Sequence, residues 1–244
     1  MRGCRGCLVS LVGTISLVTV VLWLTLPFLA SWALIGLMDI NGFNGTNTQV
    51  EVRANPPLLL LAGHADTVHI VSNNVTAGPL EAKRVDLRLE NVALITRQAG
   101  NVTGELDGVT ITAPGTPGQP AITAVLEKVT VSGPGNATQA TITMTGDEAA
   151  QLAESELKAK TGVTATITFK APNLVVLKLG TATQDGHLVI RNGDLVLVPS
   201  LTLIPAITLL HPGSGEPFRF ATMTMDQQAT LLTFTGTIDI QSLL

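Results

Sequence analysis

The segment HLVIRNGDLVLV (residues 187–198) places two runs rich in Val, Ile and Leu on either side of Asn192-Gly193. Asn-Gly is the strongest short-range signal for a type I′ hairpin turn, because both residues tolerate a positive φ. The segment therefore predicts two antiparallel strands joined by a two-residue loop.

Alternating runs of the same kind extend over most of the chain after residue 50. Val and Thr dominate them, and these residue types suit a half-buried pleated surface. Stretches rich in Gly and Pro, such as residues 77–79, 113–118 and 132–135, mark turns between the runs. Residues 50–244 are about the size of a single β domain. We expect one domain built mainly from antiparallel strands.

One helix interrupts the β pattern. Thr145 and Glu148 form a capping box, in which each side chain bonds the backbone of the other. Leu152 and Leu157 belong to an apolar stripe, and Gly162 is placed to end the helix. The fold class predicted is therefore mainly β with one long helix (α+β).

The first forty residues contain an apolar run from residue 8 to residue 38 with no charged side chain. It exceeds the roughly 20 residues that cross a bilayer. Arg2 and Arg5 precede it, which predicts a cytoplasmic N-terminus and an extracytoplasmic C-terminal domain. We interpret residues 1–40 as a cytoplasmic stub and single-pass signal anchor. Ser31-Trp32-Ala33 keeps open the alternative of signal-peptide cleavage, which would give a secreted or periplasmic protein.

The polar segment NGFNGTNTQ (residues 41–49) is predicted to be a flexible linker to the domain at 50–244. N-x-T sequons occur in predicted linkers or turns, and their glycosylation depends on the host. The sequon residues are Asn44, Asn74, Asn101 and Asn136.

Composition argues against several classes of function. The net charge is −4 without any cluster of Lys and Arg, which argues against a nucleic-acid footprint. The chain has no Tyr, and both Trp lie in the first 40 residues, so the domain lacks the usual stacking platforms. Cys4 and Cys7 precede the apolar run, and we interpret them as juxtamembrane thiols rather than a metal or redox pair.

Motifs of catalysis are absent from the sequence. It contains no P-loop, G-x-G-x-x-G or H-E-x-x-H, and the helix carboxylates such as Glu154 are expected to be solvated. His64 and His69 are expected on different faces at a helix-to-strand junction, so we predict no metal site. We expect a protein without catalytic residues or cofactors.

Two apolar segments are candidates for contact with lipid. Pro57 introduces LLLL at 58–61, and Gly63 follows, which favours a short helix. Residues 195–210 are apolar on both faces of any strand, so this segment is either buried on both sides or has one face that lines an apolar cavity or meets the bilayer. The candidate lipid-binding residues are Leu58, Leu59, Leu60, Leu61, Leu197, Leu201, Leu203, Ile207 and Leu209.

Four stretches together resemble a known family. They are VRANPPLLLLAGHADTVHI (52–70), KRVDLRLENV (83–92), the helix at 146–162 and GDLVLVP (193–199). This order of elements looks like the bacterial LmeA-like phospholipid-binding family, although Pro57-Leu58 stands where that family tends to have Pro-Phe. The resemblance implies a BPI-like (tubular lipid-binding) fold, in which a strongly curved antiparallel sheet wraps a helix and leaves an apolar groove for acyl chains.

These observations lead to three hypotheses of function. The first is a tethered extracytoplasmic protein that binds phospholipid or another acyl lipid for envelope lipid handling, at the membrane and beside envelope-biosynthesis enzymes. The alternative is a tethered structural or adhesion domain with a filled core and no ligand. A third, an envelope hydrolase or transferase, requires polar residues that converge in a pocket.

Overall fold

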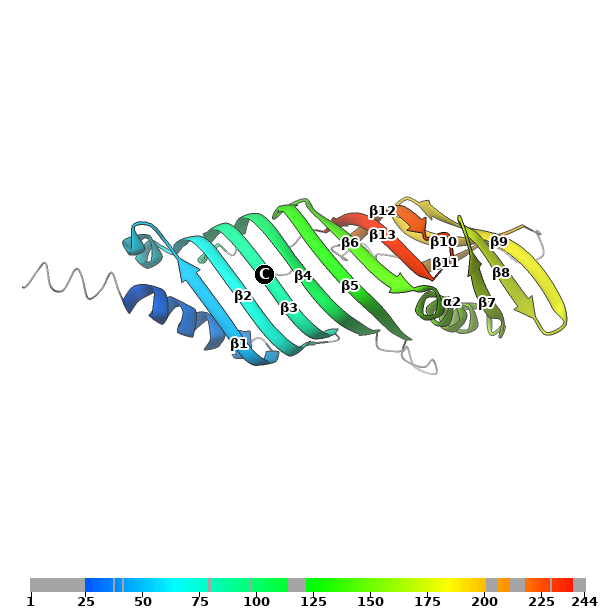
Figure 1. Ribbon diagram of the computed structural model, residues 1–244, viewed down its shortest axis with the longest axis horizontal. Coiled ribbons are helices and arrows are strands. Elements are labelled where there is room, and N and C mark those ends of the chain that lie inside the picture. Colours follow the sequence, from blue (N-terminus) through cyan, green and yellow to red (C-terminus); the bar gives the residue numbers. More distant parts are fainter. Residues whose placement is uncertain are drawn as a thin grey trace, which may run out of the picture.

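A computed structural model describes residues 25–36, 38–40, 42–78, 80–96, 98–113, 122–200, 206–210, 218–228 and 230–238. In these ranges the chain is mainly β, with two antiparallel sheets and few helices (Figure 1). The strands are β1 (Phe43–Arg53), β2 (His64–Ala77), β3 (Leu80–Ala93), β4 (Gln98–Ala113), β5 (Ile122–Pro134), β6 (Thr138–Thr145), β7 (Thr166–Lys170), β8 (Leu174–Leu179), β9 (Ala182–Arg191), β10 (Asp194–Pro199), β11 (Ile207–Leu210), β12 (Phe218–Met225) and β13 (Leu231–Ile238).

The larger sheet has eight strands in the order β1-β2-β3-β4-β5-β6-β13-β12, and the smaller has five in the order β11-β10-β9-β8-β7. Within each sheet, neighbouring strands are consecutive in the chain except where β13 joins β6, which brings residues 231–238 back beside the middle of the chain. The larger sheet forms most of the long axis, and the smaller sheet lies at the end away from β1 (Figure 1).

The hairpin at residues 187–198 is confirmed. Arg191 pairs with Asp194 across the loop, and Asn192 and Gly193 have φ of 55° and 89°. Both central residues therefore adopt the positive φ that a type I′ turn requires. The apolar strand β10 is buried on both faces, since Val196 and Leu197 are 6% and 0% exposed.

Helix α2 (Gly146–Thr161) is also confirmed, and it has 16 residues. The Thr145 hydroxyl accepts a hydrogen bond from the Glu148 amide at 3.2 Å, and the Glu148 carboxylate accepts one from the Thr145 amide at 3.0 Å. Gly162, with a φ of 72°, ends the helix. The predicted apolar stripe faces inward, and Leu152 and Leu157 are 5% and 1% exposed.

The N-terminal apolar run is described from residue 25 on. Residues 25–36 and 38–40 are helical and lie at the β1 end of the molecule (Figure 1). Within the described ranges, none of the helices has the length and hydrophobicity that a bilayer crossing requires. The predicted stub and the first part of the predicted anchor, with Cys4 and Cys7, fall outside the described residues.

The expectation of a flexible linker at 41–49 is wrong from Phe43 on, because this segment is the first part of β1. The backbone groups of this segment bond to β2, and this pairing does not require apolar side chains. Two register shifts interrupt the pairing, and Asn47, at the second of them, has a φ of 54°. The prediction that the sequons lie in linkers or turns is wrong for three of the four, because their Asn residues lie on strands. Only Asn136 lies in a turn. The three on strands are Asn44, Asn74 and Asn101.

Two clusters of buried residues hold the fold together. The α2 core joins α2 to strands of both sheets, with Leu157, Leu177 and Phe234 among its fully packed members. The β1-end core consists of residues of β1 to β6 such as Val52 and Val68. Four residues of the N-terminal helix pack against it: Ala30, Leu34, Ile35 and Met38. The cavity between α2 and the sheets measures about 10 Å³, so it holds one water at most. The α2 core is therefore filled.

Candidate functional site

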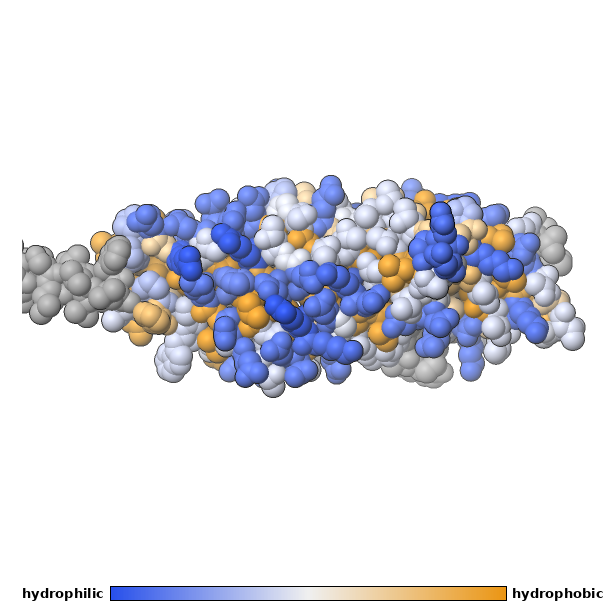
Figure 2. Space-filling model, viewed as in Figure 1, coloured by the Kyte–Doolittle hydropathy of each residue, from blue (hydrophilic) through white to orange (hydrophobic). Residues whose placement is uncertain are grey.

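The two faces of the eight-stranded sheet differ in chemistry. The outer face carries charged residues on β1 to β5 and threonines on the later strands, and Figure 2 shows blue side chains over β2 to β5. One register row continues this face as Thr130, Thr141, Thr235 and Thr222 on four neighbouring strands. The outer face is therefore a solvated surface along its whole length.

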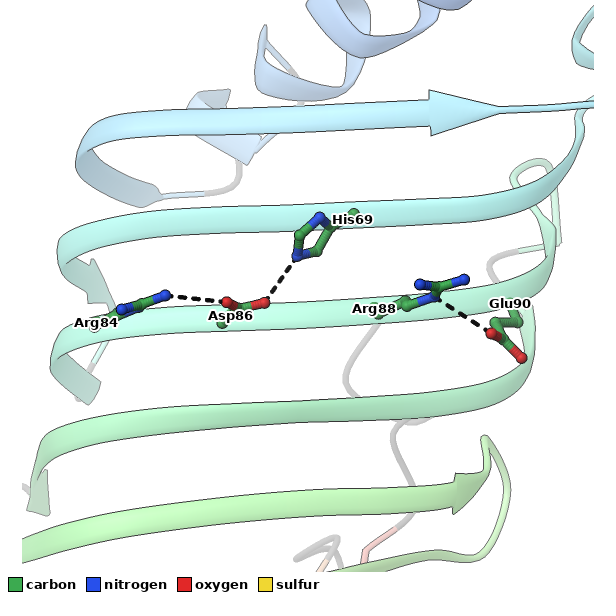
Figure 3. Close-up of polar contacts among 5 residues, drawn as sticks. All are labelled: His69, Arg84, Asp86, Arg88 and Glu90. Carbon is green, nitrogen blue, oxygen red and sulfur yellow. Dashed lines mark hydrogen bonds and ion pairs between the residues drawn. The ribbon is translucent and has the colours of Figure 1, made fainter.

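The polar contacts of the outer face join neighbouring residues of the sheet (Figure 3). His69 Nε2 lies 2.8 Å from Asp86 Oδ1, and the Arg84 guanidinium lies 3.2 Å from Asp86 Oδ2. The hydrogen bond with His69, supported by Arg84, holds the pKa of Asp86 below its ordinary value. Arg88 and Glu90 form a further ion pair at 3.3 Å. These side chains are 37–58% exposed, so we assign them to the solvated surface.

No group of three His, Cys, Asp or Glu that could hold a metal ion occurs among the residues that the structure describes. His64 lies at the start of β2 and His69 lies five residues later on the same strand, so the two point to opposite faces. The junction expected between them lies one residue earlier, at Gly63.

The inner face carries an unbroken row of apolar side chains across six strands from β3 to β12, which we call the inner row. Each member is the register partner of the next. The inner row consists of Val85, Leu106, Val129, Ile142, Phe234 and Met223.

Burial along the inner row is uneven. Val85 and Phe234 are 3% and 2% exposed, whereas the other four residues are only half-buried. Leu87 and Val129 contact both the α2 core and the β1-end core, so the apolar face is continuous between the two cores. The four half-buried residues of the inner row leave apolar surface with which a further apolar group could make contact.

The inner row ends in a pocket of about 640 Å³ between β12 and β9. Met223 and Met225 of β12 line one side, and Leu188 and Ile190 of β9 line the other. The volume lies within the range of about 300–1,000 Å³ that small-molecule sites occupy. Met side chains suit a flexible apolar ligand, because they are unbranched and adapt to irregular shapes. The pocket, together with the inner row, is the candidate site.

The candidates Leu58–Leu61 lie away from this pocket. They form η1 (Pro57–Ala62), a 3₁₀-helix, and Gly63 ends it with a φ of 75°. Leu60 packs against the β1-end core, while Leu58 and Leu61 are 47% and 67% exposed. They therefore present an apolar surface rather than the wall of a cavity.

The other candidates come from residues 195–210. Leu197 is fully buried in the α2 core. Ile207 and Leu209 belong to β11, of which only the backbone is described at these positions, and Leu201 and Leu203 lie outside the described residues. Of these four candidates and Leu197, only the Leu197 side chain is described, and it does not line the pocket between β9 and β12.

Two features were missed from the sequence. The motif TMTM at 222–225 alternates Thr with Met, which indicates one wet and one apolar face, but it was assigned only as a strand. The Glu154 carboxylate accepts a hydrogen bond from the Ile167 amide at 2.7 Å, so the expectation that it is merely solvated is wrong. Glu154 thereby anchors the start of β7 to α2.

Comparison of the chain with protein-family models, with curated proteins and with solved structures finds no match.

Proposed function

We propose that the protein binds phospholipid acyl chains along its inner row and in the pocket between β9 and β12, as a tethered extracytoplasmic protein without catalytic residues. The observation that carries this proposal is the continuity of an apolar row, four of whose six residues are half-buried, with a pocket of about 640 Å³. The opposite face of the same sheet is charged or threonine-rich, which gives the sheet a dry side and a wet side.

The dimensions of the inner row support an acyl chain as the ligand. Six neighbouring strands at about 4.8 Å spacing span about 24 Å. A single acyl chain reaches across half of a hydrocarbon core of about 30 Å. The row is therefore long enough for one extended chain.

The energetics of an acyl chain suit a site without charged anchors. At about 0.8 kcal/mol for each buried CH₂, a chain of 16 carbons would gain on the order of 10 kcal/mol before the costs of binding. Such a ligand needs no ion pair to be held. This accounts for a site whose only polar lining groups are neutral, such as Asn173 and Thr222.

The arrangement around α2 agrees with the BPI-like fold implied by the sequence resemblance. Helix α2 packs against β5, β6 and β13 of the larger sheet and against β7 and β11 of the smaller one. We propose that these sheets wrap the helix as in that fold, with the lipid site beside the wrapped helix rather than beneath it.

The test uses the full chain in membranes with a phospholipid that carries a photoactivatable diazirine in its acyl chain. After irradiation and trypsin digestion, we expect crosslinked lipid on the peptide that begins at Phe220, which contains β12. Met223→Glu should lower this signal at least five-fold, because it places a charge in the pocket. Thr237→Glu, an exposed outer-face position on β13 in the same tryptic peptide and outside the pocket lining, is the matched control and should leave it unchanged. Crosslinks confined to residues before 41 would refute the proposal.

The filled α2 core favours a second candidate, a tethered structural or adhesion domain without ligand. In that case the pocket would be a solvent-filled gap between two sheets. Met223→Glu and Thr237→Glu would then give the same low level of crosslinking as the unaltered chain.

A further inference from the structure

Large apolar side chains are exposed together at the β1 end of the molecule. Ten such side chains of the described residues are exposed, and seven of them lie at this end on three segments, with Ile40 at the last described residue of the N-terminal helix. We call the other six the tip: Phe28, Leu29 and Trp32 of the N-terminal helix, Leu58 and Leu61 of η1, and Ile95 of the β3–β4 turn. We infer that the tip inserts into the surface of a lipid bilayer, and this inference rests on the tether in the proposed function.

The contacts between the three segments hold the tip together. The Ser31 hydroxyl accepts a hydrogen bond from the Val52 amide at 3.2 Å, which fixes the helix to β1 shortly before η1. The Leu94 amide donates to the Gly63 carbonyl at 2.7 Å, which fixes the β3–β4 turn to the end of η1. Ile95 lies so close to Gly63 that an added Cβ there would fall 2.5 Å from it. These contacts therefore hold the segments of the tip in fixed positions on the folded domain.

The side chains of the tip are exposed although neighbouring apolar residues of the same helix are packed on the sheet. Phe28, Trp32 and Ile95 are 78%, 79% and 78% exposed, whereas Leu34 and Ile35 of the same helix pack on the sheet. The helix thus has one apolar side on the domain and another apolar side with no described residue covering it. Figure 2 shows orange side chains at this end of the molecule. Contiguous exposed apolar groups are characteristic of protein or membrane contact sites.

The sequence before the helix points to a bilayer as the occupant. Residues 8–24 are apolar and uncharged and lead directly into the helix at residue 25. Seventeen residues reach the lower end of the range that crosses a bilayer, roughly 17–25. The whole run of residues 8–38 is longer than a crossing needs, and its second part packs on the domain. Trp32 then falls where the run leaves the membrane, at the depth that Trp favours.

The test places a fluorophore on the tip of the full chain. Cys4→Ser and Cys7→Ser remove the two native thiols, and Leu61→Cys is labelled with the environment-sensitive dye NBD. Val163→Cys is the matched control, since Val163 is 42% exposed and follows α2 in the other half of the molecule. Both proteins are reconstituted into phosphatidylcholine and phosphatidylglycerol vesicles, with or without phospholipids brominated near the headgroup.

We expect brominated lipid to quench the dye at position 61 at least three-fold more than at position 163, with bluer emission at position 61. Adding Ile95→Glu should abolish this difference. Equal quenching at both positions would overturn the inference. Quenching at position 61 that depends on protein density but not on brominated lipid would assign the tip to a second copy of the chain instead.

A separate readout follows the helix itself. Trp23→Phe leaves Trp32 as the sole Trp, and its fluorescence should be quenched by the same brominated lipids and resist aqueous iodide. The outcome is independent of the lipid site. Crosslinking on β12 without quenching at the tip would refute the tip alone, and quenching without crosslinking would refute the lipid site alone.

Discussion

The α2 core and the β1-end core stabilise their helices in opposite ways. Helix α2 is enclosed by strands of two sheets and carries a complete capping box, and its cavity is only about 10 Å³. The N-terminal helix rests on one sheet and keeps an apolar side exposed. The difference indicates that α2 is a structural element, and it is the basis for the inference that the exposed side of the N-terminal helix contacts a bilayer.

The largest expected effect comes from truncating a leucine in each core. Leu157→Ala removes a side chain that is 1% exposed and should lower the free energy of unfolding by about 2–5 kcal/mol. Leu34→Ala, in the half-buried helix, should cost roughly 1 kcal/mol, because less apolar surface leaves water there. Urea unfolding of the full chain in detergent, followed by circular dichroism, measures both. Equal losses would contradict the distinction between the two cores.

A smaller effect is expected from removing one hydrogen bond at each helix. Thr145→Ala breaks the capping box and should cost about 1 kcal/mol. Ser31→Ala removes the acceptor of the Val52 amide and should cost about 0.5–1.5 kcal/mol.

The two variants should differ in where hydrogen exchange speeds up. In mass spectrometry of the full chain, Thr145→Ala should accelerate exchange throughout the α2 core, whereas Ser31→Ala should accelerate it only in residues 25–40 and β1. Thr141→Ala on the outer face is the control for both. If Ser31→Ala also destabilised α2, the two cores would form one cooperative unit.

The smallest effect concerns the outer face, which both cores share. Because the pKa of Asp86 is lowered in the folded protein, its ion pairs stabilise the fold at pH values above about 4, the ordinary aspartate pKa. This contribution is lost as the pH falls through the lowered pKa. Asp86→Asn should therefore cost about 0.2–1 kcal/mol at pH 6 and nothing at pH 2. Thermal unfolding across this range tests it, with Asp185→Asn as the control.

The sequence predicted correctly those elements that depend on interactions between residues close together in the chain. Asn192-Gly193, the capping box and the Pro and Gly around η1 each act within a few residues, and the structure has each of them where the sequence places it. The mainly β class followed from the same short patterns.

Non-local pairing explains what the sequence did not predict. Met223 joins the inner row only because β13 pairs with β6, which lies more than eighty residues earlier in the chain. The pocket forms where β12 meets β9 of the other sheet, and no local pattern encodes that meeting. Likewise, the polar segment at 43–49 gave no sign of its pairing with β2, since backbone groups supply the bonds.

The hydrogen bond from the Val52 amide to Ser31 also bears on self-association. Strand β1 is an edge of the larger sheet, and an open edge with free amides is a template on which another chain can add a strand. The N-terminal helix occupies one of those amides and lies over the start of the sheet. The segment that would hold the domain at the membrane therefore also blocks the addition of a further strand at this point of the edge.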